Sequence, residues 1–186
     1  YVFNSNSSTP LKPSDKTNHI SIYGKTKLRG ENKIRNISQN YVILRTSWIF
    51  SNNGLNFVNK MVELSKKFKS INVVNDQVGG PTPAKHVAST CLSIVRYLQI
   101  NPNKSGTYHF CGHPYISWFN FAKIIFQKIG NKINVDPIRT KNFPTLAMRP
   151  LNSRLDCKDI FDNFGISQPD WETELDYILS NLEIGL

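Results

Sequence analysis

The sequence predicts an α/β fold, because helical segments alternate with short apolar strands along its 186 residues. Segment 20–38 carries apolar residues at roughly helical spacing. Segment 41–46, which follows it, is an almost unbroken apolar and β-branched run, typical of a strand buried on both faces of a parallel sheet. A second helix at 84–100 and a second strand at 107–110 repeat this order and support the same fold class.

Turn residues and apolar spacing predict the remaining elements in order. The chain starts with the end of a strand at 1–3, and the Ser-, Pro-, Asn- and Lys-rich segment 4–18 is a loop. The later segments are a turn at 51–54, a helix at 57–68, a strand at 70–75, a loop at 76–83, a helix between its cap Ser117 and its stop Gly130, an extended segment at 133–139, and helices at 157–164 and 171–182. The Gly and Pro residues of loop 76–83 prevent it from continuing a helix or a strand, and such loops often carry function.

Composition narrows the class of protein. Hydrophobic residues make up 39% of the chain, no apolar run is long enough to span a membrane, and no signal-peptide pattern opens the sequence, so a cytoplasmic protein is expected. The 23 basic and 13 acidic residues give a net charge of +10, which would suit nucleic acid. The lysines are scattered without a basic run or an aromatic-basic stripe, so nucleic-acid binding is only a weak alternative.

The cysteines and histidines do not predict a metal site. Cys91, Cys111 and Cys157 are odd in number, widely spaced and set among apolar residues, and they are expected to be reduced packing residues. His109, Cys111 and His113 alternate, which would place them on one face of a strand, but no fourth ligand is evident.

Tyr23 and Lys27 are the first candidate catalytic residues. They stand four residues apart, so a helix over this segment places them on one face, about one turn apart. An ammonium close to a phenol favours the ionised phenol, which makes proton transfer near working pH efficient. A surface Tyr and Lys on a solvated helix face is the alternative, and for an isolated Tyr-x-x-x-Lys pattern it is the better interpretation.

The Tyr-x-x-x-Lys pattern is not isolated here, because other motifs accompany it in a fixed order. Through these motifs the sequence resembles the dTDP-4-dehydrorhamnose reductase family of extended short-chain dehydrogenases/reductases. The resemblance covers essentially the whole chain. Its motifs are residues 1–3, Tyr23-Gly24-Lys25-Thr26-Lys27 with Gly30-Glu31, Arg45-Thr46-Ser47-Trp48, Asn56-Phe57-Val58, residues 76–82, residues 106–110, Ser117-Trp118, Arg149-Pro150 and Pro169-Asp170-Trp171.

The resemblance implies the last step in making dTDP-L-rhamnose, in which NADPH or NADH reduces the 4-keto group of dTDP-4-dehydro-L-rhamnose. Hydride from the nicotinamide would attack the sugar C4, and Tyr23 would donate a proton to the developing oxyanion. Lys27 would keep the phenol acidic and contact the nicotinamide ribose, and Ser47 would also lie on the cofactor side.

The resemblance also implies a substrate site for a dTDP-sugar. Trp48 would stack on the substrate, Arg149 would pair with the diphosphate, and the other implied contacts are Tyr1, Asn56, Gln77, Gly79 and Thr82. Simpler alternatives remain: Trp48 packs at a domain junction, the loop at 76–83 only turns the chain, and Arg149 is an ordinary exposed arginine.

The resemblance predicts an incomplete Rossmann-like parallel sheet with helices, interleaved with a small α/β substrate domain. Residues 1–50 and 81–112 would form the C-terminal part of the NAD(P)-binding domain, and residues 51–80 and 113–186 the sugar-nucleotide domain. The family's glycine-rich phosphate loop has no counterpart here, and its third catalytic residue would lie just before Tyr1. This chain is therefore expected to be inactive alone, and the unpaired edge of strand 41–46 to favour instability, aggregation or self-association.

Two further points qualify the resemblance. At Pro83-Ala84-Lys85-His86 the family usually has an aromatic and then an acidic residue, so details near that loop transfer less well. The regulatory subunit of methionine adenosyltransferase shares the fold and works by binding a partner, so a non-catalytic regulatory or binding subunit is the alternative function. Retention of both Tyr23 and Lys27 favours an enzyme.

Overall fold

The computed structural model of the chain describes residues 1–4, 7–143 and 145–182. Its helices are α1 (Ile22–Ile37), α2 (Phe57–Ser65), α3 (Ala84–Ile100), α4 (Trp118–Lys128), α5 (Lys158–Phe164) and α6 (Trp171–Asn181). Its strands are β1 (Val42–Arg45), β2 (Ile49–Phe50), β3 (Ser70–Val74), β4 (Val78–Gly79), β5 (Thr82–Pro83), β6 (Gly106–His109), β7 (Ile116–Ser117), β8 (Asn134–Ile138) and β9 (Asn152–Ser153). The predicted α/β class is confirmed.

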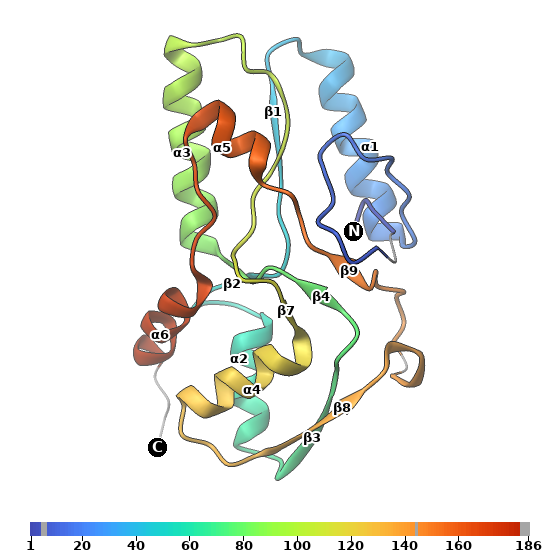
Figure 1. Ribbon diagram of the computed structural model, residues 1–186, viewed down its shortest axis with the longest axis vertical. Coiled ribbons are helices and arrows are strands. Elements are labelled where there is room, and N and C mark those ends of the chain that lie inside the picture. The colour runs from blue at the N-terminus through green and yellow to red at the C-terminus, as the bar shows by residue number, and fades with distance from the viewer. Residues whose placement is uncertain (5–6, 144, 183–186) are drawn as a thin grey trace.

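The strands form short, mostly parallel pairs. β1 pairs with β6, β2 with β5 and β3 with β8, each in parallel, whereas β4 lies between antiparallel β7 and parallel β9. The β1–β6 register places Arg45 beside His109. Helices α1 and α3 flank the β1–β6 pair on opposite sides (Figure 1).

The prediction that segment 41–46 is buried on both faces is wrong for this chain. Ile43 is buried, but Val42, Leu44 and Arg45 are only partly buried. In the described part of the chain β1 pairs with β6 alone, so its second edge has no partner strand to exclude water.

Two other predictions need correction. Loop 76–83 contains the short strands β4 and β5, because a two-residue strand needs few ladder hydrogen bonds and Pro83 stands at its end, directly before α3. The helix predicted at 57–68 ends at Ser65, because the Lys66 amide that follows donates to the Glu63 and Leu64 carbonyls and not to the carbonyl four residues earlier.

The predicted boundaries of α4 are confirmed. The Ser117 hydroxyl accepts a hydrogen bond from the Asn120 amide at 3.2 Å, and Gly130 follows the helix with φ of 67°. A serine cap satisfies one of the free amides of the first turn, and glycine adopts the left-handed backbone that ends a helix.

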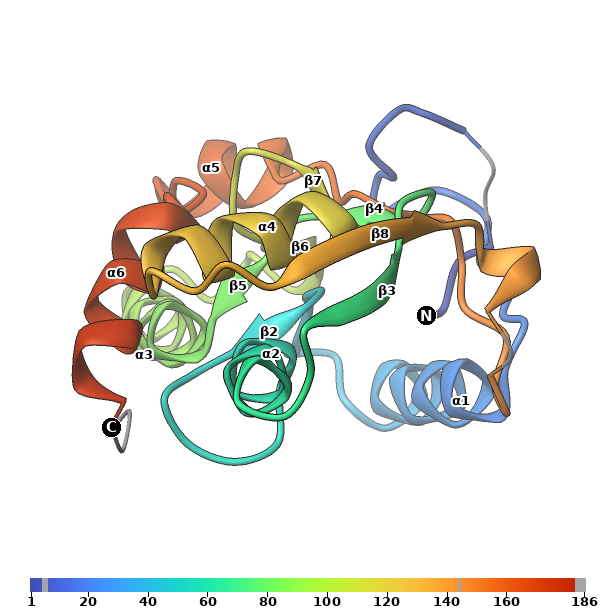
Figure 2. The same ribbon diagram turned by 90° about the horizontal axis from the view of Figure 1, so that it is seen from below.

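Two apolar clusters hold the chain together. One gathers side chains of α2, α4 and α6 around Phe121 and Trp171, and the other joins residues 2–3, α3, β6 and α5. Figure 2 shows α2 and α4 beside the paired strands β3 and β8. The predicted domain division stays a prediction; α5, assigned there to the substrate domain, packs in the second cluster. None of the helices in the described ranges is long and apolar enough to cross a membrane.

Candidate functional site

A cavity of about 540 Å³ lies between α1, the first residues of the chain, the segment joining β1 to β2, and β9. It is lined by Tyr1, Tyr23, Lys27, Ser47 and Trp48, five of the ten residues predicted to act at the site. Residues distant in sequence therefore meet at one concave surface. Such a cavity with a few convergent polar groups is the usual form of a small-molecule site.

Helix α1 brings Tyr23 and Lys27 to this cavity. The helix starts after Ser21, whose hydroxyl accepts a hydrogen bond from the Gly24 amide at 3.1 Å. Lys27 Nζ lies 5.3 Å from the centroid of the Tyr23 ring, so the ammonium sits over the phenol face. The Tyr23 side chain is exposed, which leaves its hydroxyl accessible to a ligand.

Close packing fixes the start of α1 against the beginning of the chain. A Cβ on Gly24 would lie 2.1 Å from the Tyr1 carbonyl oxygen, so only glycine permits this approach. The Tyr1 ring meets the Tyr23 ring edge to face with centroids 5.7 Å apart. Burial raises the pKa of the Tyr1 phenol, and the positive charge of Arg149 opposes that rise. Arg149 is an exposed cation, and it lies close enough to Tyr1 to affect the pKa of its phenol.

Trp48 is held in an unusual position. Its φ is 49°, in the left-handed region that non-glycine residues rarely adopt, and its ring stacks on Trp118 with centroids 3.5 Å and planes 11° apart. A Cβ on Gly79 would lie 2.7 Å from the Trp48 ring. One face of Trp48 is thus covered by Trp118, and Trp48 also lines the cavity.

The other predicted substrate residues do not line the cavity. Asn56 caps α2, accepting from the Asn59 amide at 3.1 Å, and the buried Gln77 donates to the Thr140 hydroxyl at 3.1 Å. Thr82 is fully buried, and its hydroxyl donates to the Ser47 carbonyl at 2.6 Å and accepts from the Gly112 amide at 3.2 Å. Gly79 and Arg149 are likewise not among the lining residues.

Two neighbouring hydroxyl groups precede Trp48. Ser47 Oγ donates to the Gly80 carbonyl oxygen at 3.1 Å, while Thr46 Oγ1 is buried and has no hydrogen-bond partner among the described residues. Thr46 also lines the cavity, and sequence reasoning assigned it no role. A buried hydroxyl without a partner is costly, and a bound ligand that accepts or donates here would satisfy it.

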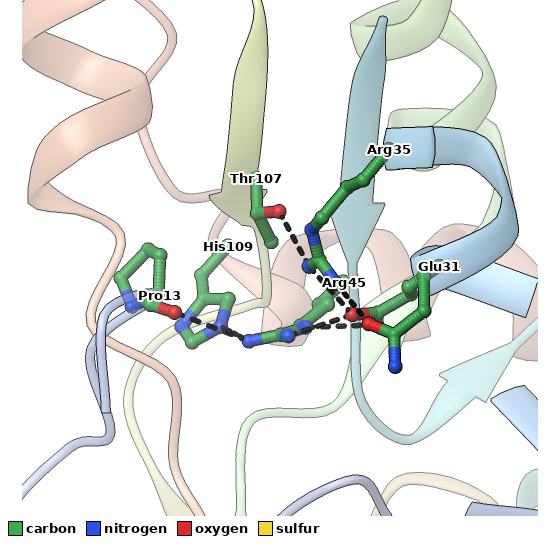
Figure 3. A network of polar contacts seen from close by, with 7 residues as sticks. Pro13, Glu31, Arg35, Arg45, Thr107 and His109 are labelled. Carbon is green, nitrogen blue, oxygen red and sulfur yellow. Dashed lines mark hydrogen bonds and ion pairs between the residues drawn. The ribbon is translucent and has the colours of Figure 1, made fainter. Parts of the chain in front are cut away.

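A buried polar network adjoins the cavity and was not predicted (Figure 3). Glu31 accepts hydrogen bonds from Arg45 Nε at 2.9 Å and Arg45 Nη2 at 2.7 Å, and from Arg35 at 2.9 Å. Burial favours a higher pKa for Glu31, but hydrogen bonds and charge from the two arginines outweigh it, so the pKa is lowered and the carboxylate stays ionised. Residues 31 and 45 belong to recognised motifs, but their pairing is visible only in three dimensions.

His109 is the neutral member of this network. Burial, helped by the charge of Arg45, lowers its pKa to about 4. Its Nδ1 lies 2.9 Å from the Leu11 carbonyl and therefore carries the proton, which leaves Nε2 to accept from Arg45 Nη1 at 3.4 Å. His109 thus joins β6 to Leu11.

The cysteines depart in part from expectation. Cys91 is exposed on α3, so it is not the packing residue that was predicted. Cys111 and Cys157 are buried as expected, and their sulfur atoms lie 3.8 Å apart despite the separation in sequence. No group of three potential metal ligands occurs within residues 1–4, 7–143 and 145–182.

Comparison with known proteins places these residues in context. The profile of the RmlD substrate binding domain family matches residues 1–184. A dTDP-4-dehydrorhamnose reductase of Aggregatibacter actinomycetemcomitans is 40% identical over 190 residues, covering 98% of this chain and 65% of the relative. A reductase of the same name from Sinorhizobium fredii is 39% identical, covering 92% of this chain and 60% of the relative. The chain therefore spans about 60–65% of the length of these curated relatives.

Solved structures agree with the fold. A crystal structure of a dTDP-4-dehydrorhamnose reductase from Clostridium acetobutylicum is similar with a TM-score of 0.89 and 34% identity, covering 98% of this chain and 63% of that one. The Bacillus anthracis reductase in complex with NADP gives a TM-score of 0.85 at 34% identity, covering 98% and 63%. A UDP-glucose-4-epimerase from Stenotrophomonas maltophila, 14% identical with a TM-score of 0.79 over 97% of this chain and 60% of that one, shares the fold alone.

Proposed function

Because this chain belongs to the RmlD substrate binding domain family, we propose that it forms the substrate-binding and proton-donating part of an NAD(P)H-dependent reductase that converts dTDP-4-dehydro-L-rhamnose to dTDP-L-rhamnose. The observation that carries the proposal is the single cavity lined by Tyr23, Lys27, Ser47 and Trp48. It brings a phenol, an ammonium and an aromatic surface together, as reduction of a sugar ketone requires.

Tyr23 acts as the general acid in this proposal. Reduction of a ketone leaves negative charge on the oxygen, and an accessible phenol in the cavity can donate its proton there. Lys27, 5.3 Å from the ring centroid, stabilises the phenolate that remains. The exposed position of Tyr23 lets the proton be replaced from solvent after each turnover.

The nicotinamide cofactor, NADPH or NADH, supplies the hydride when bound. We assign its nicotinamide end to Tyr23, Lys27 and Ser47, which fit it because they offer polar groups in one cavity beside the unpartnered hydroxyl of Thr46. The glycines of loop 76–83 do not fit the pyrophosphate of the cofactor. A Cβ on Gly80 would lie 2.2 Å from the Gly112 carbonyl, so this backbone is already packed against protein.

The substrate residues divide into two groups in this proposal. Trp48 and Tyr1 line the cavity and contact the sugar nucleotide, and Arg149 beside Tyr1 pairs with its diphosphate. Thr82 supports this wall through its hydrogen bond to the Ser47 carbonyl, and Gly79 through its close approach to the Trp48 ring, whereas Asn56 and Gln77 lie outside the lining. We also propose a cytoplasmic location, where nucleotide sugars and nicotinamide cofactors are available, and self-association through the open edge of β1.

Binding of dTDP-L-rhamnose tests the proposal without turnover. Titration calorimetry and tryptophan fluorescence are measured on the chain and on Trp48→Ala. We expect saturable heat and a fluorescence change with the parent chain, and weaker binding with the variant because it lacks the aromatic surface. The exposed substitution Leu55→Ala is the control and leaves binding unchanged. No binding at millimolar dTDP-L-rhamnose, or equal binding by Trp48→Ala, would contradict the assignment.

A further inference from the structure

We propose that Glu31 and Arg45 are positioning residues that fix the helix carrying Tyr23 and Lys27 against the strand that leads into Trp48. The inference rests on the proposed function and deepens it. Neither residue donates the proton or binds the substrate in this view. They set the distance between Tyr23, which donates the proton, and the Trp48 wall, against which the sugar lies.

One face of α1 lines the cavity. Tyr23, Lys27 and Glu31 follow one another at four-residue intervals, so they lie along one face of the helix. All three line the same cavity. Glu31 is only 8% exposed, whereas Tyr23 is exposed, so this face becomes buried towards Glu31. A displacement at Glu31 is transmitted along a rigid helix to the phenol.

Few side chains of α1 are buried among the described residues. Within its sixteen residues the buried ones are Gly24 and Glu31, and Ile22, Ile34 and Ile37 are exposed. Gly24 fixes the beginning of the helix against Tyr1, and partly buried Leu28 adds apolar contact. Within the described part of the chain, the second strong attachment of α1 is therefore the carboxylate of Glu31.

Arg45 is the main partner of that carboxylate. Arg45 closes β1, its side chain is 9% exposed, and it donates from two nitrogens to the two oxygens of Glu31 at 2.9 and 2.7 Å. Such a two-bond contact fixes orientation as well as distance. Ser47 and Trp48 follow Arg45 directly in the chain, so one contact relates the helix with the acid to the wall with the tryptophan.

The surrounding groups keep this pair in one arrangement. Arg35 donates to Glu31 at 2.9 Å and to the Thr107 hydroxyl at 3.0 Å, which ties the same carboxylate to β6. Arg45 also contacts the Pro13 carbonyl at 3.3 Å and the neutral His109 at 3.4 Å (Figure 3). Glu31 is the only carboxylate in this described network, so both cations depend on it.

The test compares Glu31→Gln with Glu31→Asp in the protein that carries this chain. We expect kcat per folded molecule to fall about 100-fold in Glu31→Gln, since a shift of about 1 Å in a reacting group costs that much, while KM for the sugar nucleotide changes little. Glu31→Asp keeps the charge, and its kcat should lie between the values of the parent protein and of Glu31→Gln. Glu63→Gln is the control, because the ion pairs of Glu63 with Lys60 and Lys67 are exposed. An unchanged kcat in folded Glu31→Gln would overturn the inference.

Hydrogen exchange of the chain provides a readout that does not depend on reductase activity. We expect faster exchange of the α1 amides in Glu31→Gln, with the amides of β3 and α4 unchanged. Equal exchange in α1 would overturn the inference. A parent protein without reductase activity would contradict the proposed function, and exchange in α1 would still decide whether the pair holds the helix.

Arg45→Lys covers the case in which Glu31→Gln does not fold. Lysine keeps the positive charge but cannot make the two-bond contact. We expect this variant to fold, to exchange faster in α1 and to lose kcat more than KM. A folded Arg45→Lys protein with unchanged α1 exchange and unchanged kcat would contradict the proposal.

Discussion

Replacement of Thr82 by valine tests whether this residue supports the site from behind rather than touching the ligand. Valine has nearly the same shape and the same branching at Cβ, so the change removes the hydroxyl and little else. In the folded chain that hydroxyl is fully buried between the Ser47 carbonyl at 2.6 Å and the Gly112 amide at 3.2 Å. Both partners would lose a hydrogen bond in the variant.

The expected cost follows from these two contacts. A buried group left without its partner costs about 1–3 kcal/mol, so two such groups predict a loss of about 2–6 kcal/mol in the free energy of unfolding. Thr82→Ser keeps the hydroxyl and loses one methyl group, worth about 1 kcal/mol. Valine should therefore be the more destabilising of the two substitutions, although it is the more hydrophobic.

Urea unfolding followed by circular dichroism measures both variants under the same conditions. We expect a lower midpoint for Thr82→Val than for Thr82→Ser, with similar slopes. Binding of dTDP-L-rhamnose should weaken in Thr82→Val, because Ser47 and the wall beyond it lose their support. A Thr82→Val protein at least as stable as Thr82→Ser would refute the reasoning.

Three further predictions concern the network and the cavity wall. The pKa of His109 is about 4 in the folded chain and 6.5 ordinarily, so the unfolded state binds a proton at a higher pH than the folded state does. The free energy of unfolding should therefore fall by about 3 kcal/mol as the pH drops from 6.5 to 4. His109→Gln should flatten this pH dependence in urea unfolding, and an unchanged pH dependence would contradict the assignment. Gly79→Ala should displace the Trp48 ring, since the new Cβ would lie 2.7 Å from it, and so change the tryptophan fluorescence and weaken dTDP-L-rhamnose binding; unchanged values would refute this. Arg149→Ala should weaken dTDP binding and reduce its salt dependence relative to Arg149→Lys, and equal affinities for the two variants would argue against a diphosphate contact.

Local patterns in the sequence were sufficient for most elements. The helix predicted at 84–100, ended by Asn101-Pro102-Asn103, matches α3, and Ser117 and Gly130 mark the ends of α4. The four-residue interval between Tyr23 and Lys27 predicts that they share a helix face. These features depend on interactions within a few residues, which is why one sequence reveals them.

Features that join distant segments were not predictable in the same way. The Glu31–Arg45 contact spans fourteen residues, and the stack of Trp48 on Trp118 requires the left-handed backbone at position 48. Thr82 lies in the loop where a nucleotide contact was predicted, yet its hydroxyl is already bonded on both sides. Tertiary packing decides which polar residue of a loop faces a ligand and which faces the interior.

The proton-donating role of Tyr23 is the central claim, and reduction by a Tyr23→Phe protein tests it most directly. NAD(P)H oxidation with dTDP-4-dehydro-L-rhamnose is measured in the protein that carries this chain, together with dTDP-L-rhamnose binding. Phenylalanine keeps the ring beneath Lys27 and removes only the proton donor. We expect reduction to be abolished and binding to be retained; turnover equal to that of the parent protein would contradict the account.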